Sequence, residues 1–344
     1  MLKEIKKNIK IDAVIPILNE EESLHQCLTS IVSLNVPENV SMRINIIDGG
    51  SEDSSLNIAK GFMENHQNIF ILNNPKKIQS AAMNMVINSS DSDYILRLDA
   101  GNIYSKDYLI NCLETSIRRD ADNVGGLITT IAASGSFSSS IVESIMSHPF
   151  GVGNSTFRTG SSEEKKVDTV PFGFFKKNVF KKVGLFNENL LRAQDYELNS
   201  RIINGGGEIW LNPKIKGDYL ALPLMKFLRK LFFLEGPYNA YMWYLSPESF
   251  SIRHSITLFF CIGVIGGIIL SPLNAFIKLI YFCVLALYLI LAVISSIQVS
   301  IQKRDLRFFI CMPLIFFLYH FIHGFGVLLG VVRIITRTSP VQRN

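Results

Sequence analysis

The sequence predicts an α/β domain built on a parallel sheet, followed by a C-terminal region that spans a membrane. The first 130 residues alternate short β-branched or aromatic runs with helix-patterned stretches. The repeat is roughly 25 residues, which is typical of strand–helix–strand units with helices on both faces of the sheet. Near the C-terminus, Ser255–Gln302 contains one charged residue, Lys278, and residues 308–332 contain none.

Four strands are predicted from apolar runs bounded by Asn, Gly or Asp: AVIPIL (13–18), INIID (44–48), IFIL (69–72) and YILRLD (94–99). Between these runs, apolar residues recur at helix spacing. Ligands bind beyond the carboxyl ends of strands in such sheets. Polar residues stand at three of these ends: Asn19-Glu20, Asp48 with Ser51, and Asp99. Each group taken alone is also typical of a turn or a helix cap, but their coincidence predicts a ligand site at one edge.

After residue 123 the pattern changes. VGGLITTIAA (124–133) predicts a further strand, and the polar stretches SGSFSSS (134–140) and HPFGVGNSTFRTGSSEEKK (148–166) predict a mobile loop able to order over substrate. Asp195, Glu197 and Arg201 then follow a helical pattern that ends at Gly205-Gly206-Gly207. The run EIWL after these glycines predicts another strand.

A spanning helix needs about 20 apolar residues. Ser255–Gln302 therefore fits two spans joined at Ser271–Asn274, and residues 308–332 fit a third span or a re-entrant segment broken by Pro313. Residues 221–245 mix basic and aromatic side chains, which suits helices in the membrane interface, although a core helix with exposed lysines has the same composition. The predicted organisation is a catalytic domain over 1–220, interfacial amphipathic helices over 221–250, a membrane domain with two to three spans over 251–335, and a tail over 336–344.

The formal charge of +5 is modest, and its basic residues cluster beside the apolar segments, which favours the membrane surface as their partner. No basic-aromatic stripe typical of nucleic-acid binding is present. The N-terminus does not have the pattern of a signal peptide, so we expect residues 1–220 in the cytoplasm. The five cysteines form no C-x-x-C pair and are expected to be reduced, structural thiols.

Several stretches taken together resemble the inverting family 2 glycosyltransferases of the GT-A fold, over residues 11–219. They are VIPILNEE, NIIDGGSED, KIQSAAMN, LRLDAGN, PFGFFKK with VGLFNENL, and RAQDYELNSRI. HPFGVGN and FRTG are similar to the succinoglycan-biosynthesis branch, whose members build bacterial exopolysaccharide on a lipid carrier. The resemblance implies a nucleotide-sugar donor, usually a uridine diphosphate sugar, and a polyprenyl-phosphate-linked acceptor at the cytoplasmic face of a bacterial or archaeal cell membrane.

The same resemblance assigns roles to individual residues. The nucleotide and donor sugar are expected to lie against Pro16, Asn19, Glu20, Asp48, Ser51, Gln79, Asn84 and Arg97. Asp99 takes the position of the metal-binding acid, for Mg²⁺ or Mn²⁺, both of which prefer oxygen ligands. Asp195 matches the general base that takes the proton from the acceptor hydroxyl. Supporting roles around the acceptor fall to Glu197, Arg201 and Arg229.

Two positions depart from the family pattern. Gly101 stands where a second acid or a histidine usually follows the first metal-binding acid, and Gln194 precedes Asp195 where many relatives have two acids. A single carboxylate can hold Mg²⁺ when substrate phosphates and water complete the shell. His148 is a candidate extra ligand, although a lone histidine is more often structural.

The resulting hypothesis is a membrane-anchored hexosyltransferase of extracellular or capsular polysaccharide synthesis. Its expected protein partners are a second copy of the chain or a polysaccharide-assembly complex. One alternative is a nucleotidyltransferase, although VIPILNEE lacks the glycine-rich, lysine-bearing loop that such enzymes carry near the first strand. Another is a non-catalytic nucleotide-binding scaffold subunit of a polysaccharide-export complex.

Overall fold

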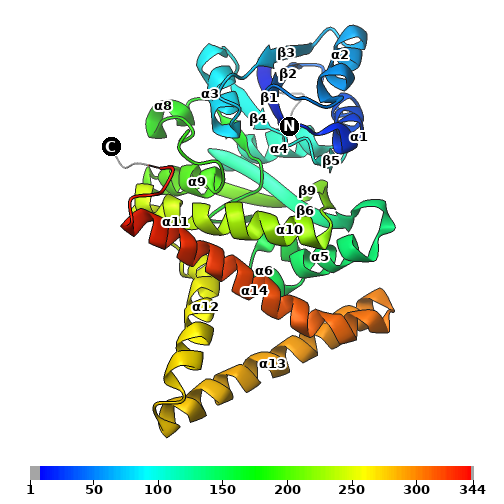
Figure 1. The fold of residues 1–344 in the computed structure, drawn as a ribbon. Helices are drawn as coiled ribbons and strands as arrows, with labels where there is room; N and C mark the ends of the chain where they lie inside the picture. The colour runs from blue at the N-terminus through cyan, green and yellow to red at the C-terminus, as the bar shows by residue number, and fades with distance from the viewer. Residues whose placement is uncertain (1–7, 342–344) are drawn as a thin grey trace. The chain divides into compact units, whose positions relative to one another are not determined.

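A computed structural model describes residues 8–341 (Figure 1). The first seven residues of the predicted catalytic domain and the last three of the predicted tail, residues 342–344, lie outside the described residues. The chain forms two compact units. Unit 1 holds the described residues up to 129 together with 160–220, and unit 2 holds residues 130–159 together with those from 221 onward.

Unit 1 is organised by a nine-stranded mixed sheet in the order β3-β2-β1-β4-β8-β6-β9-β5, with β7 paired to β9. Its first four strands are parallel and match the predicted ones: β1 (Ile9–Ile17), β2 (Val40–Asp48), β3 (Ile69–Asn73) and β4 (Tyr94–Arg97). Because β1 lies between β2 and β4 and all three are parallel, the polar residues that follow these strands lie next to one another at their carboxyl ends.

The remaining strands give the sheet its mixed character. The strand β8 runs antiparallel to both β4 and β6, and β9 runs antiparallel to β5 and β7. The glycine Gly126 lets β6 approach β9 closely, since a Cβ there would lie 2.0 Å from the carbonyl oxygen of Ile215. The bounds are β5 (Asn102–Tyr104), β6 (Asn123–Ala132), β7 (Lys165–Lys166), β8 (Phe174–Lys176) and β9 (Ile209–Ala221).

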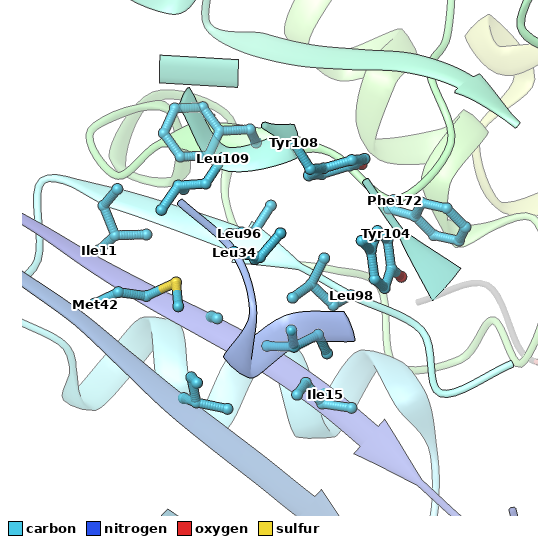
Figure 2. Packing of buried hydrophobic residues seen from close by; sticks show 14 of the residues in the cluster. Ile11, Ile15, Leu34, Met42, Leu96, Leu98, Tyr104, Tyr108, Leu109 and Phe172 are labelled. Carbon is cyan, nitrogen blue, oxygen red and sulfur yellow. The ribbon is translucent and has the colours of Figure 1, made fainter. Parts of the chain in front are cut away.

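Helices form where the apolar spacing predicts them, as α1 (Glu21–Val32), α2 (Ser55–Asn65), α3 (Gln79–Ser89) and α9 (Gln194–Asn204). Two further helices that the sequence analysis did not predict are α4 (Tyr108–Arg119) and α8 (Val179–Val183). Figure 2 shows the core beneath the site, where Leu96 and Leu98 pack with the rings of Tyr104, Tyr108 and Phe172. The backbone that leads from β4 to Asp99 is thus anchored in a buried apolar cluster.

The prediction of a loop after β6 is wrong for residues 137–140, which form the first turn of α5 (Phe137–Ser147). Ser136 caps this helix by accepting a hydrogen bond from the Ser139 backbone N–H at 3.2 Å. Its apolar residues Ile141, Val142 and Ile145 are buried in the core of unit 2. Two short helices follow, α6 (Pro149–Val152) and α7 (Thr156–Thr159). Burial of one apolar face therefore overrides the serine-rich composition.

The rest of unit 2 is helical. A broken helix comes first, formed by α10 (Leu224–Lys230), a π-helical turn (Leu231–Glu235) and α11 (Gly236–Leu245). Three apolar helices follow, α12 (Ile252–Leu270), α13 (Ala275–Lys303) and α14 (Leu306–Ile335). The break between α12 and α13 lies at residues 271–274, and α14 continues through Pro313. By length and composition, α13 and α14 are the described helices long enough to cross a membrane.

Candidate active site

Three loops at the carboxyl edge of the parallel strands position the predicted polar residues. Ile17 pairs with Asp48 at the ends of β1 and β2, and Val14 pairs with Arg97 where β4 ends. The segments that follow these strands therefore emerge at the same edge of unit 1, which is the usual ligand-binding edge of an open α/β sheet.

The Asp48 carboxylate organises the loop after β2. Its Oδ1 accepts hydrogen bonds from the Ser51 backbone N–H at 3.0 Å and from Ser51 Oγ at 2.7 Å. Between them, Gly50 adopts φ +82°, a left-handed conformation that glycine takes without steric cost. The Ser51 hydroxyl oxygen also accepts the backbone N–H of Asn19 at 3.1 Å.

Further hydrogen bonds join the loop after β1 to the loop after β2. Asn19 Oδ1 accepts the Glu52 backbone N–H at 2.8 Å, and the Glu20 N–H donates to Ser55 Oγ at 2.7 Å. Asn19 itself is left-handed at φ 56°, a conformation that asparagine tolerates better than most residues. The structure thus brings Asn19, Glu20 and the Asp48–Ser51 pair together, with Pro16 on β1 opposite Ile47.

Hydrogen bonds with neighbouring residues fix the backbone of Asp99. Its N–H donates to the Tyr104 hydroxyl oxygen at 2.7 Å, and its carbonyl oxygen accepts Asn102 Nδ2 at 3.2 Å. The Cys27 thiol donates to the same carbonyl at 3.6 Å. Burial raises the pKa of Cys27, which keeps it a neutral thiol and a donor. These contacts fix the position from which the Asp99 side chain projects.

The Arg97 guanidinium bridges Asp99, the predicted metal-binding acid, and Asp195, the predicted base. Its Nε and Nη2 donate to Oδ1 and Oδ2 of Asp99 at 2.9 and 3.1 Å, and its Nη1 donates to Oδ1 of Asp195. The Arg97 side chain is only 3% exposed, whereas both carboxylates are 27% exposed. Arg97 is therefore a buried cation paired with two partly exposed carboxylates. A cation this deeply buried needs such partners to compensate for its lost hydration.

The environment of Asp195 suits a proton acceptor. Burial among protein atoms raises the pKa of its carboxyl to about 6, against the lowering effect of the Arg97 guanidinium. A carboxylate with a pKa near this value holds a proton more readily than an ordinary aspartate yet is ionised at neutral pH. The role of Asp195 as the base therefore stays a prediction, and this raised pKa is compatible with it.

The other predicted residues of unit 1 make internal contacts. Gln79 donates to Asp99 Oδ1 at 2.9 Å. Asn84 is buried, and its Nδ2 donates to the Phe186 carbonyl and to Glu188 Oε1, both at 2.9 Å. The side chains of Glu197 and Arg201 form a bidentate pair on α9, with both hydrogen bonds at 2.7 Å. Through Arg201, this pair also binds the carbonyl of Leu185, which ties α9 to the preceding loop.

The predicted residues His148 and Arg229 belong to unit 2. His148 Nδ1 accepts the Phe150 backbone N–H at 3.1 Å, its Nε2 lies 2.9 Å from Gln298 Oε1, and its ring packs against Phe316. Both ring nitrogens are therefore engaged within unit 2. Arg229 is exposed on α10.

A divalent cation fits this site through one protein oxygen. Within the described part of the chain, no three His, Cys, Asp or Glu side chains gather as a metal centre. Asp99 Oδ1 accepts two hydrogen bonds and Oδ2 accepts one, so Oδ2 retains a lone pair. Apart from its chain neighbours, no residue has an atom within 4 Å of a Cβ built on Gly101, so the space at that position is open. Phosphate oxygens and water would have to supply the remaining ligands.

Sequence reasoning missed the contribution of Gln194, Tyr104 and Cys27. Gln194 is 4% exposed and donates to Gln79 Oε1 at 2.7 Å. The sequence offered one signal of its contribution, because an amide stands at 194 where many relatives have an acid. Tyr104 and Cys27 look like ordinary core residues in the sequence, because their contacts with Asp99 depend on the tertiary fold.

The sequence comparisons point to one family. The Glycosyl transferase family 2 model matches residues 12–184. The chain is 27% identical to the dolichyl N-acetyl-α-D-glucosaminyl phosphate 3-β-D-2,3-diacetamido-2,3-dideoxy-β-D-glucuronosyltransferase of Methanococcus voltae, covering 94% of this chain and 97% of that protein. It is 30% identical to the succinoglycan biosynthesis protein ExoA of Rhizobium meliloti, covering 60% of this chain and 62% of that protein.

A solved structure supports the fold. The mannosyltransferase PcManGT from Pyrobaculum calidifontis, in complex with GDP-Man and Mn²⁺, has a TM-score of 0.62 and 11% identity. The match covers 97% of this chain and 89% of that one. Unit 1 has the GT-A architecture that the sequence predicts. Because the family model matches half of the chain, including the strands and loops that carry Asp48 and Asp99, this protein belongs to glycosyl transferase family 2.

Proposed function

We propose that this protein is an inverting, membrane-anchored glycosyltransferase. Its donor would be a nucleotide-diphosphate sugar, with uridine diphosphate sugars as the first class to test. Its acceptor would be a saccharide carried on polyprenyl phosphate, in the synthesis of extracellular or capsular polysaccharide. One observation carries the proposal: the partly open carboxylates of Asp99 and Asp195 meet around buried Arg97, at the edge where nucleotides bind in such sheets.

The donor side is supported by the joined loops after β1 and β2. Asp48 uses Oδ1 to hold Ser51, and both carboxylate oxygens can accept further hydrogen bonds from a base or a ribose. The Asn19–Glu52 and Glu20–Ser55 hydrogen bonds fix this pair of loops before a ligand arrives. A preformed loop pair lowers the entropy cost of binding a nucleotide.

The chemistry requires one proton acceptor and no covalent intermediate on the enzyme. Asp195 would take the proton of the acceptor hydroxyl while that oxygen bonds to the anomeric carbon of the sugar. The bond from this carbon to the diphosphate oxygen breaks, and its electron pair leaves with the nucleoside diphosphate. Attack from the face opposite the leaving group inverts the anomeric centre.

Asp99 would hold Mg²⁺ or Mn²⁺ through the free lone pair of Oδ2, together with the donor diphosphate. The bound cation would neutralise the negative charge that develops on the leaving group. Because Arg97 and Gln79 already bind the Asp99 carboxylate, we expect the cation to bind only weakly without the nucleotide.

The acceptor assignment is supported by the Methanococcus voltae relative, whose name specifies a dolichyl-phosphate-linked sugar and which matches this chain across both units. Unit 2 adds two helices long enough to span a membrane. It also exposes Met225 and Phe233 beside Lys226 and Arg229, a pattern suited to an anionic membrane surface. Anchoring the enzyme there would raise the effective concentration of a lipid-linked acceptor.

The test is transfer of labelled sugar from a panel of nucleotide sugars to extracted polyprenyl-phosphate-linked saccharide. The proposal predicts that wild-type protein transfers one sugar and that Asp195→Asn lowers turnover by about 10²–10⁴-fold. Nucleotide binding should persist in this variant. Wild-type turnover by Asp195→Asn would show that Asp195 is not the base, and nucleotide binding without any transfer by wild type would favour the scaffold function.

A further inference from the structure

Five side chains close a ring at the active-site edge of unit 1. Arg97 binds both Asp99 and Asp195, Gln79 Nε2 donates to Asp99 Oδ1 at 2.9 Å, and Gln194 Nε2 donates to Gln79 Oε1 at 2.7 Å. Gln194 and Asp195 are neighbours at the start of α9, which completes the ring. The ring therefore connects α3, the end of β4 and α9.

The hydrogen bonds of the ring have a fixed direction. An ionised carboxylate only accepts, so Gln79 must present its NH₂ group to Asp99 and its carbonyl oxygen to Gln194. The side chain at position 194 must consequently be a donor. A glutamate there would place a carboxylate against the Gln79 oxygen, or would turn the Gln79 oxygen toward Asp99. This requirement explains why an amide stands at 194, where the family resemblance leads us to expect an acid.

Two members of the ring are buried, and the backbone beside one of them is constrained. Arg97 is 3% exposed and Gln194 is 4% exposed. The residue before Gln194, Ala193, has a left-handed φ of 63°, which is unfavourable for an alanine and must be offset by the contacts around it. The guanidinium fork of Arg97 matches two carboxylates in a way that a lysine ammonium cannot.

We propose that Arg97, Gln79 and Gln194 are positioning residues that hold Asp99 and Asp195 at a fixed separation before any substrate binds. The inference rests on the proposed function for the role of Asp195 as base. It assigns Arg97 to the support of the two acids rather than to direct contact with the donor. Loosening the ring should therefore lower kcat while leaving nucleotide affinity unchanged.

The experiment compares two ring variants with a matched control in full-length protein in detergent. Gln194→Glu replaces the amide that donates to Gln79 with a carboxylate that can only accept. Arg97→Lys keeps the positive charge but removes the guanidinium that binds both carboxylates. Asn199→Asp is the control, because it makes the same amide-to-carboxylate change at a 2% exposed position of the same helix. Its amide donates to the Thr169 hydroxyl at 2.9 Å, and that hydroxyl can donate in return to a carboxylate.

Three quantities are measured: kcat at saturating donor, the Kd of whichever of UDP, GDP and TDP wild type binds, and hydrogen exchange across α9 without ligand. Both ring variants should lose about 10²-fold in kcat, since small misplacements of catalytic groups cost this much. Their nucleotide Kd should stay within about twofold of wild type, and exchange across α9 should accelerate. Asn199→Asp should keep the kcat and nucleotide Kd of wild type, and its exchange measures what a buried carboxylate alone does to α9.

The proposal is overturned if Gln194→Glu matches Asn199→Asp in exchange and turnover, or if Arg97→Lys loses nucleotide affinity instead of kcat. Should one ring variant fail to fold, the other decides the question by the same readouts. If wild type transfers no sugar, the proposed function fails, yet exchange across α9 in the ligand-free proteins still shows whether the ring holds this helix in place.

Discussion

Asp195 lies between two opposing influences. Burial favours its protonated form, and the adjacent Arg97 guanidinium favours its ionised form. Burial is the larger of the two, so the pKa rises to about 6 instead of falling as it would in an exposed ion pair. A general base with this pKa combines ionisation at neutral pH with useful proton affinity.

The first prediction concerns the pH dependence of this base. Only ionised Asp195 can accept a proton, so kcat/KM, which reports the free enzyme, should rise tenfold per pH unit below about 6 and level off above it. The measurement is the initial transfer rate from pH 4.5 to pH 8 at substrate concentrations well below KM, with protein integrity checked at each pH. A rate that is flat across pH 6, or that falls as pH rises, would contradict the assignment.

The second prediction concerns the space beside Asp99. Gly101 has no atom within 4 Å of a built Cβ and does not adopt a positive φ, so Gly101→Asp should fold normally and add a second carboxylate. Its attraction for a cation should tighten Mn²⁺ binding without nucleotide by about tenfold or more. Electron paramagnetic resonance titration of free Mn²⁺ measures this, with Gly101→Ala as the control. Equal affinities in the two variants would place the cation elsewhere.

At the residue scale, sequence patterns found the acids but not the geometry that joins them. Asp48 and Asp99 could be predicted because each stands at the end of an apolar strand. The pairing of Arg97 with Asp195 joins residues 98 positions apart and depends on where α9 packs. Neither strand periodicity nor helix spacing carries that information.

At the scale of elements, the parallel half of the sheet followed from hydrophobic runs. The strands β1, β2 and β4 are largely buried, β3 lies at the end of the strand order, and all four are bounded by turn residues, so local composition was decisive. The helix α5 was missed because SGSFSSS dominates the composition of its first turns. Its apolar residues Ile141, Val142 and Ile145 gain stability only from the packing of unit 2, which the sequence does not display.

A third prediction tests how two apolar helices pack. A Cβ on Gly324 of α14 would lie 1.9 Å from the carbonyl oxygen of Thr257 on α12, so these helices meet at the glycine. Gly324→Ala should therefore lower the free energy of unfolding by about 1–3 kcal/mol, as overpacking does. Gly266 of α12 has no atom within 4 Å of a built Cβ, and Gly266→Ala should be neutral or slightly stabilising.

Thermal unfolding of both glycine variants in the same detergent checks this prediction. The expected result is a lower midpoint for Gly324→Ala and an unchanged or higher midpoint for Gly266→Ala. Equal midpoints would mean that α12 and α14 do not approach each other at Gly324.

At the scale of the whole molecule, the chain combines a family 2 catalytic fold with a helical unit that contains two candidate spans. Their apolar stretches were evident in the sequence, because charged residues are nearly absent over lengths that a membrane span requires. The division into units was less evident. Residues 130–159 belong with the C-terminal helices, although they lie within the catalytic half of the sequence.

The most direct test of the account is calorimetric titration of full-length protein with UDP, GDP and TDP, with and without Mn²⁺, beside Asp99→Ala. The account predicts that one nucleotide binds, that Mn²⁺ strengthens this binding, and that Asp99→Ala removes the Mn²⁺ effect. A protein that binds no nucleoside diphosphate, or binds one equally with or without Mn²⁺ and Asp99, would contradict a donor site at the carboxyl edge of β4.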